Sequence, residues 1–148
     1  MSRDFRPQMT QQSLMLEFQS IMYDLENKVQ GIMHDSIDDF KNTVAKHADR
    51  SVYPAYTPKR YDRRMDAGGL SDTSNYEVTE DKLELTLNNK TTSGGHYGYS
   101  IDITDVVEQG NGYGWEGIPA RPFMDDALDE FAHEILEPRI REALGGER

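Results

Sequence analysis

The residues best suited to metal chemistry are four histidines, because the chain contains no cysteine. His34 and Asp38 lie one helical turn apart and could share a metal ion, and His133 directly precedes Glu134. A metal site needs three or four converging ligands, and neither pair has a third ligand nearby in the sequence. We therefore expect neither a metal site nor a cofactor, and we interpret both pairs as parts of solvated helix faces.

Acidic pairs and a glycine-rich run are the next candidates. Adjacent residues on a helix diverge by about 100°, so neither Asp38–Asp39 nor Asp125–Asp126 converges on one substrate atom. Residues 110–119 are rich in glycine but lack the Gly-Lys-Ser/Thr ending of a phosphate-binding loop. We expect a surface loop there, in which Trp115 either covers the core or anchors an interface. None of these patterns predicts an enzyme.

Residues 52–64, which we call the tyrosine–arginine segment, combine aromatic and cationic side chains. Four cations minus Asp62 give this segment a charge of +3, whereas the whole chain carries −11. Pro54 and Pro58 exclude a regular helix and favour extended backbone. We expect a docking segment, although tyrosines beside prolines also commonly cap a small core with arginines stacked on them. The aromatic and cationic residues are Tyr53, Tyr56, Tyr61, Lys59, Arg60, Arg63 and Arg64.

Apolar periodicity supplies the elements that would hold these residues. Steps of three and four residues predict a long amphipathic helix over 11–48, with a bend or a division near Gly31. Alternation predicts antiparallel strands within 76–103, at 76–79, 82–88 and 97–103, with a turn at 80–81. A second helix is expected over 121–144, with Pro122 at the first helical position and a kink or end at Pro138.

These elements predict one α+β domain over 1–148, with a long N-terminal helix, a small antiparallel sheet of three to four strands and a C-terminal helix. Residues 1–12 are expected to be flexible, and residues 52–72 to be extended. Polar residues 1–12 do not resemble a signal peptide, and no apolar run reaches the roughly 20 residues of a membrane span. The acidic balance argues against wrapping duplex DNA.

The order of several short motifs resembles the head–tail joining, or tail-completion, proteins of tailed bacteriophages, often labelled minor capsid proteins. The resemblance covers about 52–128, with the long helix before it. Each motif alone is weak, and their order and spacing carry the resemblance. The motifs are Val52-Tyr53-x-x-Tyr56-x-Pro58-x-x-Tyr61-x-Arg63-Arg64, Gly69-Leu70, Leu87-Asn88-Asn89, Val107-Glu108-x-Gly110 and Ala120-Arg121-Pro122-Phe123-Met124.

The resemblance implies a non-enzymatic structural protein of the virion neck, where tail meets head. It implies a ring of copies, six-fold by analogy with tail-end rings, around the passage through which DNA moves without sequence-specific binding. Implied partners are other neck, connector and tail-tube proteins, and the implied location is the virion, with host cytoplasm before assembly. The candidate interface residues are Tyr53, Tyr56, Tyr61, Arg63, Arg64, Trp115, Arg121 and Phe123.

Two other classes stay open. An acidic protein can mimic DNA and inhibit a DNA-binding protein, which would require carboxylates spaced like phosphates along one face. A small phage hydrolase is the third class, and the ligand count above disfavours it.

Overall fold

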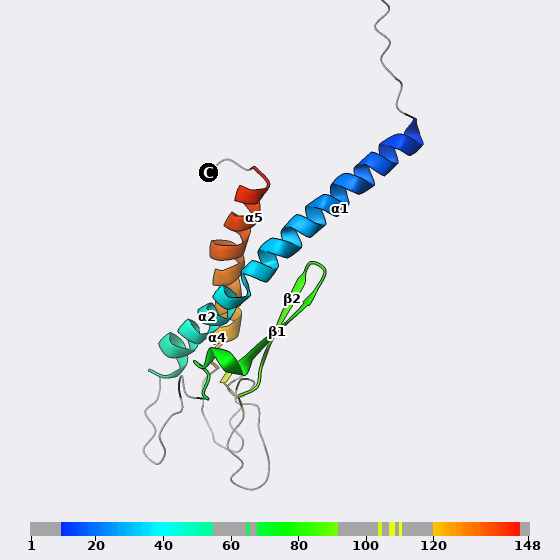
Figure 1. The fold of residues 1–148 in the computed structure, drawn as a ribbon. Coiled ribbons are helices and arrows are strands. Elements are labelled where there is room, and N and C mark those ends of the chain that lie inside the picture. The colour runs from blue at the N-terminus through cyan, green and yellow to red at the C-terminus, as the bar shows by residue number, and fades with distance from the viewer. Residues whose placement is uncertain are drawn as a thin grey trace, which may run out of the picture.

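The computed structural model describes residues 10–54, 65, 68–91, 104, 107–108, 110 and 120–145. In this part of the chain, helices and one small antiparallel sheet form an α+β arrangement. Figure 1 shows helix α1 extending away from the remaining elements, which gather around its C-terminal end.

Helix α1 (Gln11–Asp35) begins at Thr10, whose hydroxyl accepts a hydrogen bond from the backbone N–H of Ser13 at 3.2 Å. The long helix is divided at Ser36, not at Gly31 as the glycine suggested, and helix α2 (Ile37–His47) follows. The Ser36 hydroxyl donates to the carbonyl of Ile32 at 2.7 Å, and side-chain bonds of this kind bend helices. A π-helical turn, Ala48–Val52, ends α2.

Strands β1 (Tyr76–Asp81) and β2 (Glu84–Asn89) form an antiparallel hairpin in which Tyr76 pairs with Asn89. The turn expected at 80–81 lies at 82–83 instead, where Lys82 has a positive φ of 50°. Non-glycine residues rarely adopt this backbone conformation, so composition gave no signal for the turn. The described part of the sheet has two strands, and the third expected strand, 97–103, lies outside it.

The C-terminal helical region consists of α4 (Phe123–Glu130), a π-helical stretch (Phe131–Leu136) and α5 (Glu137–Ala143). Pro122 precedes α4 instead of opening it, and the carboxylate of Glu108 accepts the N–H of Met124 there. Pro138 does not end the helical region. The wider π-helical turns before it change the hydrogen-bond register, which accommodates a residue without an N–H.

The core lies where α2 packs against α4 and the π-helical stretch. Phe40 and Phe131 stack there, with ring centroids 4.4 Å apart and an interplanar angle of 16°. Phe123 and Ala127 are fully buried beside them. The buried cluster consists of Phe40, Val44, Ala48, Val52, Leu70, Tyr76, Phe123, Ala127 and Phe131.

Gly69 is tightly enclosed by its neighbours. A Cβ atom at this position would lie 2.5 Å from the carbonyl oxygen of Met65 and 2.8 Å from the Tyr53 hydroxyl. That hydroxyl accepts the N–H of Leu70 at 2.8 Å, so the contact belongs to the turn that leads into the sheet.

We expect Gly69→Ala to destabilise the protein by about 2 kcal/mol or more, because the crowded neighbours include backbone atoms that cannot rotate away. Urea denaturation measures this loss. Gly31→Ala is the matched control: its Cβ would meet nothing within 4 Å, so helix propensity should raise stability by about 1 kcal/mol. Equal effects of the two substitutions would contradict the tight turn at Gly69.

Candidate assembly surface

The N-terminal half of α1 exposes large apolar side chains to solvent. Phe18 is 63% exposed, and none of the described residues covers it. Soluble proteins rarely leave contiguous apolar surface uncovered unless it binds something. We call residues 14, 15, 18, 21 and 22 the free face of α1; these residues are Leu14, Met15, Phe18, Ile21 and Met22.

The free face lies on the same side of α1 as apolar residues that pack within the chain itself. One helical turn spans 3.6 residues, so Val29, Ile32 and Met33 lie on the same side of α1 as Phe18. In the C-terminal half of α1, Met33 is buried, Val29 and Ile32 are half-buried, and Ile32 lies beside α5. The two helices then diverge (Figure 1), so α5 does not cover the apolar residues in the N-terminal half of α1.

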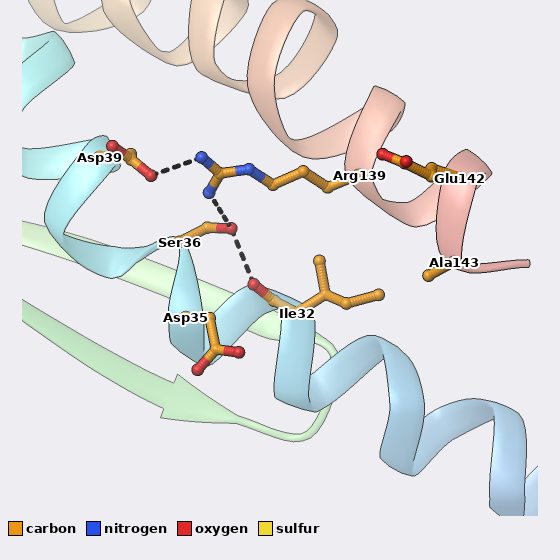
Figure 2. Close-up of a pocket in the computed structure, with 7 residues that line it drawn as sticks. All are labelled: Ile32, Asp35, Ser36, Asp39, Arg139, Glu142 and Ala143. Atoms are coloured by element: carbon orange, nitrogen blue, oxygen red, sulfur yellow. Dashed lines mark hydrogen bonds and ion pairs between the residues drawn. The ribbon is translucent and has the colours of Figure 1, made fainter. Parts of the chain in front are cut away.

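Arg139 of α5 fixes the corner from which α1 extends. Its guanidinium donates to the Asp39 carboxylate at 2.7 Å and to the Ser36 hydroxyl at 2.9 Å (Figure 2). Ser36 is fully buried, so one arginine joins α5 to the junction between α1 and α2. An open pocket of about 480 Å³ lies beside this junction and is lined by Ile32, Asp35, Ser36, Asp39, Arg139, Glu142 and Ala143.

We expect Arg139→Met to reduce stability by about 1 kcal/mol, because two charge-assisted hydrogen bonds are lost from a half-exposed site. It should also speed hydrogen exchange of the amides near Ser36. The control is Arg141→Met, which breaks an exposed i,i+4 pair with Glu137 that is worth roughly 0.3–0.5 kcal/mol. If hydrogen exchange near Ser36 were unchanged in Arg139→Met, Arg139 would not hold the junction between α1 and α2.

Two further polar contacts hold elements against one another. His34 of α1 lies 2.7 Å from the Glu80 carboxylate of β1, and this contact raises the pKa of His34. Lys46 and His47 of α2 both bind Glu130 of α4, and their hydrogen bonds hold the pKa of Glu130 below its usual range. The stabilising effect of a lowered carboxyl pKa is present at neutral pH and is lost as the pH falls through the folded-state pKa.

The candidate interface residues predicted from sequence differ in their burial, and several lie outside the described residues. Phe123 is fully buried in the core, so it is not a surface contact of the folded chain. Tyr53 is half-buried against the core and binds the turn at Leu70, as the core-capping interpretation expects. Arg121 is half-buried and donates to the carbonyl of Val52 at 3.4 Å. Tyr56, Tyr61, Arg63, Arg64 and Trp115 lie outside the described residues.

The sequence-based candidates did not include the free face. Leu14, Phe18 and Ile21 were part of the helical periodicity, and a helix longer than its core signals a neighbour. Which residues lack a partner depends on where α5 diverges, and periodicity does not encode that.

Among the described residues, no group of three potential metal ligands comes together. None of the described helices is long and apolar enough to cross a membrane.

The described chain is thus a small α+β protein with an amphipathic helix that extends past its own core. It belongs to the YomN family, whose model matches residues 17–144. This match runs from the second turn of α1 to the end of α5. No curated protein and no solved structure matches the chain.

Proposed function

We propose that this protein is a non-enzymatic structural subunit of the neck of a tailed virus particle. Copies of it form a ring, six-fold by analogy, that joins or completes the tail at the head–tail interface around the DNA passage. Its partners are further copies and other neck, connector and tail-tube proteins. It resides in the virion, and in the host cytoplasm before assembly.

The free face of α1 is the observation that carries this proposal. Five large apolar side chains on one side of an extended helix form a binding surface, and a ring supplies a neighbour for it at every position. The resemblance of the motifs between 52 and 128 to head–tail joining proteins is the reason for proposing the neck as the place of assembly. The net charge of −11 is compatible with a passage from which DNA is repelled and through which it slides.

The DNA-mimic alternative fits the described carboxylates less well. A mimic needs carboxylates spaced like phosphates along one face, whereas six of the described acids lie within 4 Å of a basic side chain, which lowers the charge available at those positions. The pairs are Asp39–Arg139, Glu77–Lys90, Glu80–His34, Asp129–His133, Glu130–Lys46, Glu130–His47, Glu137–His133 and Glu137–Arg141.

Reconstitution tests the proposal. Particles produced without this protein should accumulate as separate heads and tails, and addition of the purified protein should join them into infectious particles. Joined and infectious particles in its absence would overturn the proposal. Inhibition of a DNA-binding protein by the purified chain would favour the mimic instead.

A further inference from the structure

We propose that the free protein is a homodimer in which the N-terminal halves of two α1 helices pack antiparallel through their free faces. This dimer covers the surface that the ring would use, so the dimer has to open before the ring can form. The second statement rests on the proposed function; the dimer itself does not.

The apolar row on α1 matches itself when it is reversed. Leu14, Phe18, Ile21 and Leu25 follow one another at steps of four, three and four residues, which read the same in both directions. In an antiparallel pair centred between residues 19 and 20, Leu14 lies opposite Leu25 of the partner subunit. Phe18 then lies opposite Ile21 of the partner subunit. A two-fold contact requires this reciprocity.

Lys28, which continues the row, disfavours the parallel direction. Lys28 continues the row three residues after Leu25. A parallel pair would place Lys28 against Lys28 of the partner subunit inside the contact, where two like charges repel each other. The antiparallel pair places Lys28 opposite Gln11 of the partner subunit, whose amide oxygen can accept a hydrogen bond from the ammonium group.

The position of α5 supports the same direction. Helix α5 runs antiparallel to α1 and contacts only the C-terminal half of α1 (Figure 1). An antiparallel partner helix would occupy the side of α1 from which α5 diverges. The rest of each subunit would lie at opposite ends of the helix pair, which avoids a collision that parallel pairing would create.

The size of the face is sufficient for a modest dimer. The side chains of Leu14, Met15, Phe18, Ile21 and Met22 are 42–63% exposed. Together with Leu25, their exposed parts would bury on the order of 1,200 Å² over both copies, which is the lower limit of stable interfaces. An interface of this size is consistent with a dissociation constant on the order of micromolar. Such a dimer can form in the free protein and dissociate when the ring assembles.

Disulfide crosslinking tests the register, because the natural chain has no cysteine. Leu14→Cys and Leu25→Cys proteins, mixed and oxidised, should form a mixed disulfide dimer, while each protein alone should stay mostly uncrosslinked. Ser20→Cys, on the opposite side of α1, is the control that should not crosslink. Self-crosslinking of Leu14→Cys without the mixed dimer would overturn the antiparallel arrangement.

Sedimentation of the purified protein tests the dimer independently of crosslinking. The natural chain should sediment as a dimer at concentrations well above micromolar, and Phe18→Glu should weaken dimerisation by about 100-fold or more. A natural chain that stays monomeric over this range overturns the dimer. Reconstitution of head–tail joining is a separate readout, so failure of the dimer and failure of the neck function can be told apart.

Discussion

Replacement of Phe18 and Ile21 by glutamate is expected to abolish the joining of heads to tails and leave the monomer folded. These side chains are 63% and 53% exposed, so their loss removes little from the core of the chain itself. In an assembled contact, two carboxylates would be buried without partners, which costs several kcal/mol. We expect at least a 100-fold loss of infectious particles in reconstitution, with the helical circular dichroism and the melting temperature nearly unchanged.

The control for this double substitution adds the same charges to another side of the same helix. Ser20→Glu with Asn27→Glu points away from the free face and should leave joining near the natural level. Equal losses in the two double variants would mean that α1 tolerates no added charge, and the assignment of the free face would then be wrong.

Phe123→Ala is expected to destabilise the protein by about 3–5 kcal/mol, because Phe123 is fully buried and its removal leaves a cavity in the core. This is a large part of the roughly 5–15 kcal/mol that stabilises an ordinary domain. Urea denaturation should show the midpoint fall, and any loss of joining should follow from the unfolded fraction.

Leu128→Ala on the same helix is the matched control, since Leu128 is 51% exposed and should contribute about 1 kcal/mol or less. If Phe123→Ala instead kept natural stability and blocked joining, Phe123 would be an interface residue, as the sequence motif suggested.

The helices could be predicted from sequence because their signals are local. The apolar steps from Leu14 onward define α1, and Gly145, with a φ of +78°, follows the end of α5 close to the expected limit at 144. The division at Ser36 was not predicted; the Ser36 hydroxyl bonds to the nearby Ile32 carbonyl and also to Arg139, which lies 103 residues away and gives no local signal. Likewise, the turn at Lys82 uses a backbone conformation that its residue type disfavours.

The sequence predicted an interaction surface but did not predict that it would lie on α1. The length of the N-terminal helix indicated a protein that packs on neighbours, and Figure 1 shows α1 extending past the other elements. Residue type did not distinguish Phe123 from Phe18, since both are large and apolar in amphipathic helices. Burial distinguishes them: Phe123 packs in the core, whereas Phe18 is exposed.

A reconstruction of the neck in tailed particles assembled with this protein tests the central claim most directly. The proposal predicts a closed ring of copies of this chain at the head–tail junction, in which the free face of each α1 contacts a neighbouring subunit. A neck without this chain, or with one isolated copy per particle, would contradict the account, as would a ring in which α1 contacts only its own subunit.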